Sequence, residues 1–275
     1  MTTLFSARGL AKRFGDRVVL QDVSFAVDEG EVHGIMGPNG AGKTTCFHVL
    51  TGHYRPDAGT VEFHGKDITG LAPRHIARLG IARSFQVMNL FDDFTALENV
   101  MVATRALRAR GYSLFRDAAR LDAARERAER ALADVGLAGK EPARAKSLSY
   151  GDRRALEIAV ALAAEPSLLF LDEPTAGLGA DGIARVAQLV RDLRGKVTLV
   201  IIEHDMRFLF GLADRISVVH WGQVIARGTP DELRANDWVR RSGIGDARRP
   251  GLDPGPRLDS GVRRNDEAPA RDDEA

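Results

Sequence analysis

The stretch GPNGAGKTT, residues 37–45, decides the fold of this 275-residue chain. It follows the strand-like run EVHGIMG and precedes the helical run CFHVLTG, so a glycine-rich loop joins a strand to a helix. Glycines allow consecutive backbone N–H groups to surround a phosphate at a helix N-terminus, where the helix dipole favours negative charge. The pattern G-x-x-x-x-G-K-[ST] in this context predicts a loop that binds a nucleoside triphosphate. A chance glycine-rich turn would not explain the lysine, the threonine and the flanking elements together.

The loop supplies the groups that a bound triphosphate needs. Lys43 is predicted to reach the β- and γ-phosphate oxygens, and Thr44 is predicted to offer its hydroxyl to Mg²⁺. The residues of the loop that are predicted to contact the nucleotide are Gly37, Pro38, Asn39, Gly40, Ala41, Gly42, Lys43, Thr44 and Thr45.

Two apolar, strand-like runs end in residues that suit phosphate chemistry. The run LLFLDEP, residues 168–174, delivers Asp172 to a strand end as a ligand for Mg²⁺, and Glu173 follows as a base for an attacking water. A surface Asp-Glu turn would explain the dipeptide alone, but not its place after a buried strand in a chain with a phosphate loop. The run VTLVII, residues 197–202, ends just before His204, for which a γ-phosphate contact is a better interpretation than a structural role.

The alternation of strands and helices predicts an α/β fold with a mostly parallel sheet. Residues 1–65 form a β-rich start, and a helical part follows over about 87–160. The charged helical pattern over 117–136 has a thin apolar stripe and is interpreted as a solvated face. Residues 244–275 are rich in proline and charge, so we expect a disordered tail after a domain of residues 1–243.

The composition excludes several classes of protein. Lysine plus arginine number 39 against 38 aspartate plus glutamate, a net charge of +1, which favours neither nucleic acid nor an acidic substrate as a partner. The single cysteine, Cys46, excludes an intramolecular disulfide and fits a reducing compartment. The first residues lack the apolar core of a signal peptide, and apolar runs are interrupted by Glu157 and Glu165. We therefore expect a soluble chain that binds no nucleic acid.

The stretch LSYGD, residues 148–152, places a serine and a bare glycine backbone at the start of another helical pattern. It is similar to the signature sequence of the ABC (ATP-binding cassette) ATPases, usually LSGGQ. The resemblance covers about residues 4–242 and includes the motifs above in the family's order. It implies a P-loop NTPase core with an antiparallel β subdomain and a helical subdomain that carries the signature. It also implies that Ser149 and Gly151 contact the γ-phosphate of ATP held by a second chain.

The same resemblance assigns two further residues and reveals three departures. Phe14 matches the aromatic residue that stacks on adenine, and Gln86, in ARSFQ, matches the glutamine that touches Mg²⁺ and water and responds to the membrane subunit. Tyr150 and Asp152 stand where glycine and glutamine are commonest. Gly179 stands where the D-loop, the segment after the catalytic glutamate, usually carries an aspartate for communication between the chains of a dimer.

Several stretches, among them LSYGDRRALEIAVALA and ADRISVVHWGQVIARGTPDEL, resemble the ATPases of high-affinity branched-chain amino acid importers. The resemblance implies a peripheral subunit on the cytoplasmic face of the inner membrane that hydrolyses ATP with Mg²⁺. It further implies a second ATPase subunit (identical or related), two membrane permease subunits and, indirectly, an extracytoplasmic solute-binding protein.

Other functions are open to different degrees. Importers of urea, amides or aromatic acids belong to the same branch and remain an alternative. A soluble ABC ATPase of translation or DNA repair is less favoured, because the chain has one cassette and only a modest helical insert. A GTPase is disfavoured because no N-K-x-D-like motif is present, and a cassette that only binds ATP is disfavoured by Glu173.

Overall fold

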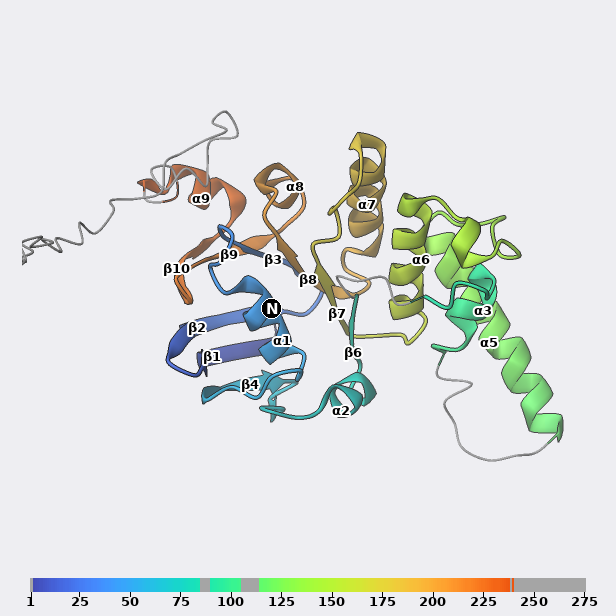
Figure 1. Cartoon of the computed structure of the whole chain (residues 1–275), viewed down its shortest axis with the longest axis horizontal. Coiled ribbons are helices and arrows are strands. Elements are labelled where there is room, and N and C mark those ends of the chain that lie inside the picture. Colours follow the sequence, from blue (N-terminus) through green and yellow to red (C-terminus); the bar gives the residue numbers. More distant parts are fainter. Residues whose placement is uncertain (1, 85–89, 105–113, 238, 240–275) are drawn as a thin grey trace, which may run out of the picture. The chain divides into compact units, whose positions relative to one another are not determined.

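A ten-stranded mixed sheet forms the centre of the computed structural model, which describes residues 2–84, 90–104, 114–237 and 239 (Figure 1). Among these residues the strand order is β5-β4-β1-β2-β10-β9-β3-β8-β7-β6. The strands are β1 (Thr3–Phe14), β2 (Arg17–Asp28), β3 (Val32–Met36), β4 (Ala58–Phe63), β5 (Lys66–Asp67), β6 (Ile81–Arg83), β7 (Leu168–Asp172), β8 (Thr198–Glu203), β9 (Arg215–His220) and β10 (Gln223–Gly228).

The strands β9, β3, β8, β7 and β6 form the parallel part of the sheet. The strands β3, β7 and β8 are buried along their whole length, as is usual for parallel strands with helices on both faces. The register pairs Met36 with Glu203 and Asp172 with Ile202, so the carboxyl ends of these three strands meet at one edge. The predicted α/β fold with a parallel core is confirmed, and this edge carries the residues that were assigned to phosphate chemistry.

The strands β5, β4, β1 and β2 form the antiparallel part and come from the β-rich start of the sequence. The long ribbon of β1 and β2, with 12 residues in each strand, shifts register at four places, as β-bulges do where a ribbon bends and twists. The ring of Phe5 in β1 meets that of Phe170 in β7 edge-on, with 5.5 Å between the ring centroids. Phe47 belongs to the same apolar cluster, so one core joins the two parts of the sheet.

Helices pack on both faces of the parallel strands. The helices of the described residues are α1 (Lys43–Leu50), α2 (Pro73–Arg78), α3 (Ala96–Met101), α5 (Leu114–Asp134), α6 (Tyr150–Leu162), α7 (Ala180–Leu193), α8 (Met206–Phe210) and α9 (Pro230–Ala235), with a 3-10 turn η1 (Ala145–Ser147). Phe170 packs in the cluster that includes α1, whereas its neighbour Leu171 packs in the cluster that includes α7 and α8. Successive side chains of a strand point to opposite faces, and here both faces are apolar.

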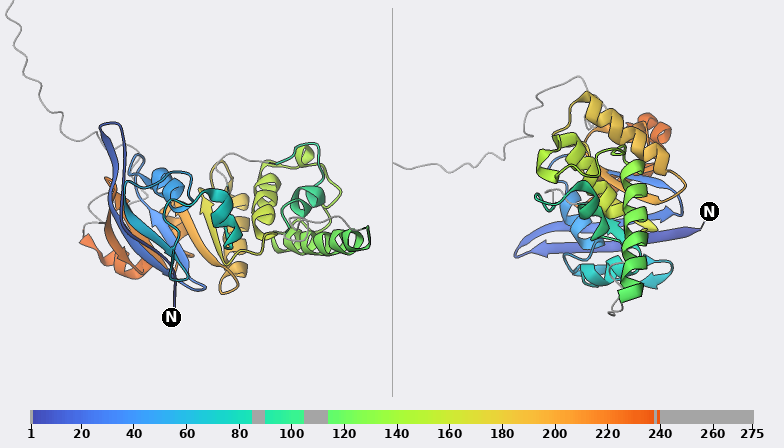
Figure 2. Two further views of the ribbon diagram at one scale, coloured as in Figure 1. Left: turned by 90° about the horizontal axis from the view of Figure 1, so that it is seen from below. Right: turned by 90° about the vertical axis from the view of Figure 1, so that its right-hand side faces the viewer.

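The helices α3, α5 and α6 lie together beside the β6–β7 edge of the sheet and share a separate apolar cluster (Figures 1 and 2). The stripe on α5 contributes Ala128, Ala131 and Leu132, which are fully buried there, whereas Leu121 is half exposed. Over residues 124–132, where side chains are described, the apolar stripe of α5 is therefore a packing face. The tail predicted for residues 244–275 lies outside the described residues.

Candidate functional site

The phosphate loop lies where β3 passes into α1, as the sequence predicts. A Cβ atom on Gly37 would come within 2.1 Å of the carbonyl oxygen of Val219 in β9, so only glycine fits at this close approach. Gly42 is the N-cap of α1 in a left-handed conformation and gives the helix no side-chain cap. The first N–H groups of α1 are therefore left for an acceptor from outside the helix, which suits a phosphate.

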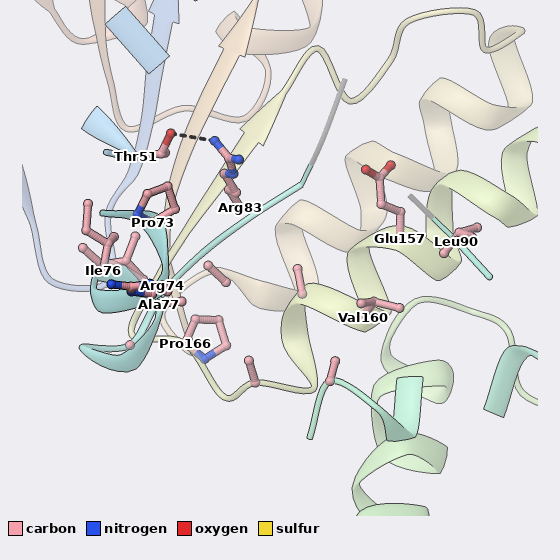
Figure 3. A pocket seen from close by; sticks show the side chains of 16 residues that line it. Thr51, Pro73, Arg74, Ile76, Ala77, Arg83, Leu90, Glu157, Val160 and Pro166 are labelled. Atoms are coloured by element: carbon pink, nitrogen blue, oxygen red, sulfur yellow. Dashed lines mark hydrogen bonds between the residues drawn. The ribbon is translucent and has the colours of Figure 1, made fainter. Parts of the chain in front are cut away.

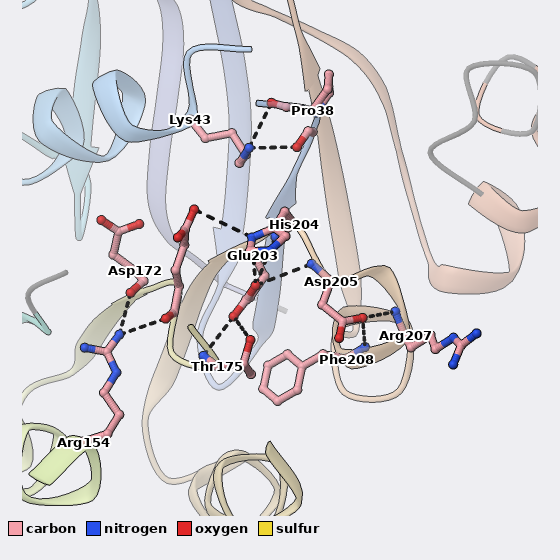
Figure 4. Close-up of polar contacts among 12 residues, drawn as sticks. Pro38, Lys43, Arg154, Asp172, Thr175, Glu203, His204, Asp205, Arg207 and Phe208 are labelled. Carbon is pink, nitrogen blue, oxygen red and sulfur yellow. Dashed lines mark hydrogen bonds and ion pairs between the residues drawn. The ribbon is translucent and has the colours of Figure 1, made fainter. Parts of the chain in front are cut away.

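Lys43 lies across the phosphate loop. Its side chain is buried, and Nζ donates to the carbonyl oxygens of Gly37 at 2.8 Å and Pro38 at 3.0 Å (Figure 4). Burial lowers the pKa of Lys43, and the carboxylates of Glu173 and Asp172 oppose this shift. The ammonium group thus sits between the loop and the acidic strand end, where it can exchange carbonyl oxygens for phosphate oxygens.

One cleft of about 440 Å³ brings several predicted residues together. Its described lining residues are Phe14, Arg17, Val19, Asn39, Gly40, Gly42, Lys43, Thr44, Thr45 and Glu173. Phe14 is 44% exposed, and its ring meets that of Tyr54 edge-on at 5.3 Å between centroids. The cleft therefore offers an aromatic surface at one position and phosphate-binding groups at another. Arg17 was not predicted, because a single arginine in a β-hairpin carries no sequence signal.

Asp172 and Glu173 end β7 in different environments. Asp172 is only 3% exposed, and burial, together with the charge of Glu173, raises its pKa to about 6. Glu173 has a φ angle of 44°, which is uncommon for a residue other than glycine. Its N–H donates to the carbonyl oxygen of Ile202 at 2.9 Å, so β8 holds this backbone in place. Strained backbone of this kind is frequent at functional sites.

His204 follows β8 and lies beside Glu203, as Figure 4 shows. The distance from its Nδ1 to Oε1 of Glu173 is 3.8 Å, and the ring is about half exposed. Glu203, just before it, is fully buried and was not predicted to act in the site. Its carboxylate accepts hydrogen bonds from Oγ1 of Thr175 and, at 3.0 Å, from the N–H of Thr175. Glu203 thereby fixes the segment that follows Glu173.

Arg154 of α6 holds the same segment from the other side. Its Nη2 donates to the carbonyl oxygens of Asp172 at 2.7 Å and Glu173 at 3.0 Å. Its Nη1 pairs with Oε2 of Glu157 at 2.6 Å, and both side chains are buried. Sequence reasoning missed Arg154, because an arginine in an amphipathic helix is ordinarily a surface residue. The helix that begins at the signature thus supports the backbone of the predicted base.

The predicted contacts of the signature do not line the nucleotide cleft. Neither Ser149, the N-cap of α6, nor Gly151 is among the described residues that surround it. A Cβ on Gly151 would meet only Arg185 and Leu178, at 3.8 and 3.9 Å, which is ordinary contact. Packing within the chain therefore does not require glycine at 151, unlike at Gly37. A bare backbone at this position is better explained by a partner than by the fold of its own chain.

Tyr150 connects the signature to the segment after Glu173. Its hydroxyl donates to the carbonyl oxygen of Ala176 at 3.2 Å. Gly177 has a φ angle of 73°, and a Cβ on it would lie 3.0 Å from the Tyr150 hydroxyl oxygen and 3.2 Å from ring carbons. The ring thus covers the open side of Gly177. Tyr150, one of the departures from the usual signature, has a structural task within its own chain.

A second cleft, of about 320 Å³, lies between α2, β6 and α6 (Figure 3). Ile76, Leu90 and Val160 give it an apolar lining, and Arg74 and Glu157 add charge. Nη1 of Arg83, which also lines this cleft, donates to Oγ1 of Thr51 at 3.0 Å. Thr51 is the C-cap of α1, so one hydrogen bond connects this wall to the helix of the phosphate loop.

Gln86 lies outside the described residues, so the structure does not place it. Among the residues that are placed, no group of three or more His, Cys, Asp or Glu side chains has the arrangement of a metal site. In the described part of the chain, no helix is long and apolar enough to cross a membrane.

The fold and the phosphate loop define a P-loop ATPase with a signature-bearing helical part. The sequence profile of the ABC transporter family matches residues 20–176. LivG of Salmonella typhimurium, a high-affinity branched-chain amino acid transport ATP-binding protein, is 39% identical over 251 residues, 89% of this chain and 98% of LivG. LptB of Acidithiobacillus ferridurans, a lipopolysaccharide export system ATP-binding protein, is 36% identical over 90% of this chain and 98% of LptB.

Two solved structures are also similar. The ADP conformation of MJ1267, an ATP-binding cassette of an ABC transporter, has a TM-score of 0.78 and 29% identity and covers 90% of this chain and 100% of MJ1267. The dimeric post-hydrolysis state of the cassette MJ0796, bound to ADP and Pi, has a TM-score of 0.69 and 26% identity and covers 82% of this chain and 99% of MJ0796.

The chain belongs to the ABC transporter family, and it is an ATP-binding subunit with ATPase activity that is similar to the ATPases of branched-chain amino acid transporters. Cassettes of this family work as dimers with membrane permease components.

Proposed function

We propose that this chain is the ATP-hydrolysing subunit of an importer for branched-chain amino acids or related small polar solutes, attached to the cytoplasmic face of the inner membrane. The cleft that joins Phe14, the phosphate loop and Glu173 is the observation that carries the ATPase part of this proposal. The higher identity to LivG than to LptB supports the transport of amino acids rather than lipopolysaccharide export.

Within one chain, the cleft binds ATP and prepares the attack on its γ-phosphate. Phe14 stacks on the adenine, and Lys43 with the N–H groups at the start of α1 neutralises the phosphates. Glu173 takes the proton from an attacking water, and the backbone contacts from Arg154 and Ile202 hold it in position. His204 lies 3.8 Å from Glu173 and contacts the γ-phosphate from the neighbouring strand end.

The oxygen donors at the strand edge suit Mg²⁺ as the cofactor of this reaction. Asp172 provides a carboxylate and Thr44 a hydroxyl, and both are hard oxygen ligands. Burial, together with the charge of Glu173, raises the pKa of Asp172, and a divalent cation bound beside it would favour the ionised carboxylate. Bound there, Mg²⁺ would neutralise charge on the β- and γ-phosphates. By resemblance, Gln86 would add an amide oxygen.

A second ATPase subunit completes each site. Ser149 and Gly151 lie outside the cleft of their own chain, and Gly151 has room that packing does not use. We assign them to the γ-phosphate of ATP held by the opposing subunit, so that ATP closes the dimer and hydrolysis opens it.

The second cleft is our candidate for contact with the two membrane permease subunits. Its apolar lining, with the exposed Arg74 beside it, fits a short amphipathic segment of a permease. The hydrogen bond from Arg83 to Thr51 gives this wall a direct connection to the helix of the phosphate loop. A solute-binding protein outside the membrane would act only through the permeases. Importers of urea, amides or aromatic acids would use the same arrangement.

The Glu173→Gln variant tests the catalytic part of the proposal. It should still bind ATP, lose on the order of 10²–10⁴-fold in turnover, and form dimers with ATP in light scattering. Hydrolysis near the wild-type rate would remove Glu173 from the role of base. The solute is tested by disrupting the gene and measuring the uptake of labelled leucine, urea and an aromatic acid. Unchanged leucine uptake would contradict the amino acid assignment.

A further inference from the structure

The signature of this chain has a carboxylate next to the hydroxyl that its proposed function needs. Oγ of Ser149 donates to Oδ2 of Asp152 at 2.8 Å, and the backbone N–H of Asp152 donates to Oγ of Ser149 at 3.2 Å. Asp152 is only 7% exposed. The hydrogen of the Ser149 hydroxyl is therefore directed to a buried carboxylate, whereas contact with a γ-phosphate would require it to turn away.

The carboxylate also creates a problem of charge. A γ-phosphate that docks at Ser149 would come close to Asp152, and two negative groups at short distance in a partly buried place repel each other strongly. Burial tends to raise the pKa of Asp152, but hydrogen bonds from Lys140 and Ser149 outweigh it and lower the pKa. Asp152 is thus ionised at neutral pH, so the repulsion must be offset by a cation.

Two cations from different elements meet Asp152. Nζ of Lys140, in the turn between α5 and η1, is 2.7 Å from Oδ2, and Nη1 of Arg185, on α7, is 3.6 Å from Oδ1. The Lys140 side chain is 43% exposed and that of Arg185 is 67% exposed. Lys140 makes the shorter contact, with the same oxygen that accepts from Ser149. Arg185 adds a second positive charge that is more exposed to solvent.

We propose that Lys140 is a positioning residue of the ATPase reaction, which acts by neutralising Asp152 so that Ser149 can donate to the γ-phosphate on the opposing chain. This inference rests on the proposed sandwich dimer. Lys140 does not touch ATP in its own cleft, and its effect is exerted only when two chains close. Arg185 supports the same neutralisation at a longer distance and contributes less.

The experiment measures ATP-driven dimers in the Glu173→Gln background by light scattering. Adding Lys140→Gln should raise the ATP concentration for half-maximal dimer roughly tenfold, because it leaves Asp152 without its closest cation. ATP affinity of the monomer should be unchanged, since Lys140 is not among the described residues that line the cleft. Adding Asp152→Asn to Lys140→Gln should return the ATP concentration for half-maximal dimer to within about twofold of the parent value, because residue 152 then carries no charge that repels the γ-phosphate.

A matched control is Lys146→Gln. Lys146 pairs with Asp93 at 2.6 Å on the same helical part of the chain, and both side chains are exposed. This variant should dimerise like the parent. If Lys140→Gln dimerises like the parent, or if Asp152→Asn fails to rescue it, the inference about Lys140 is wrong. If the Glu173→Gln parent itself forms no dimer with ATP, two copies of this chain do not build the ATP sandwich on which this inference rests, and the inference fails.

Discussion

The Arg154→Met substitution should strongly destabilise the chain, although it changes no residue that lines the nucleotide cleft. Arg154 is 3% exposed and Glu157 is 4% exposed, and their ion pair is 2.6 Å long. Removal of the guanidinium takes this partner from a buried carboxylate, which typically costs about 3–5 kcal/mol in the free energy of unfolding. It also removes the hydrogen bonds to the carbonyl oxygens of Asp172 and Glu173, each of which contributes about 1 kcal/mol to the free energy of unfolding.

The double variant Arg154→Met/Glu157→Met separates these contributions. It removes both charges, so no unpaired charge is left buried. Its free energy of unfolding should therefore fall by only about 1–3 kcal/mol in total, the loss of the hydrogen bonds to the two carbonyl oxygens. Urea unfolding followed by circular dichroism measures the stability of each variant. Both variants should also lose turnover with little change in ATP affinity, because the segment around Glu173 loses its support. Stability of Arg154→Met within about 1 kcal/mol of wild type would refute the reasoning.

Three further changes test separate parts of the structure. Lys43→Ala should weaken ATP binding, since it removes the charge that faces the phosphates, and unchanged affinity in calorimetry would contradict the phosphate-loop assignment. Phe14→Ala should cost about 1–3 kcal/mol of ATP binding, with a similar loss for GTP because ring stacking does not read base edges; a loss for only one nucleotide would argue against stacking. His33 lies in β3 and is fully buried, and this burial lowers its pKa, so the folded state resists a proton that the unfolded state accepts below about pH 6.5. Stability should therefore fall below that pH, by up to about 1.4 kcal/mol per pH unit, and His33→Gln should flatten this fall in urea titrations at several pH values.

The parts of the site that sequence could predict are those with a fixed order along the chain. The phosphate loop is a local motif between a strand and a helix, so Lys43 and Thr44 could be assigned before the fold was known. Asp172 and His204 could be assigned because buried parallel strands bring their carboxyl ends to one edge. Such patterns depend on chain order and on the repeat of the strand, and both can be read directly from the sequence.

The residues that sequence could not predict act through tertiary contacts. Arg154 reaches carbonyl oxygens 18 and 19 residues away, and no local pattern marks an arginine that turns inward. Lys140 meets Asp152 across a turn, and Arg185 meets it from another helix. Sequence reasoning located Glu203 only as the end of a strand. Its full burial depends on the loop that folds over it, and no local pattern predicts that contact. These side chains support the chemistry, and their identity depends on geometry that the sequence does not state.

The contact between Tyr150 and Gly177 bears on how parts of such cassettes can be exchanged. The tyrosine ring restrains from outside a glycine that has no side chain of its own to hold it. Replacing LSYGD in this chain with the common LSGGQ sequence would remove that ring, and the loop next to Glu173 in this chain would then be less restrained. The signature and the loop at 174–179 should therefore be transplanted as a pair, since the ring of the one packs on the backbone of the other.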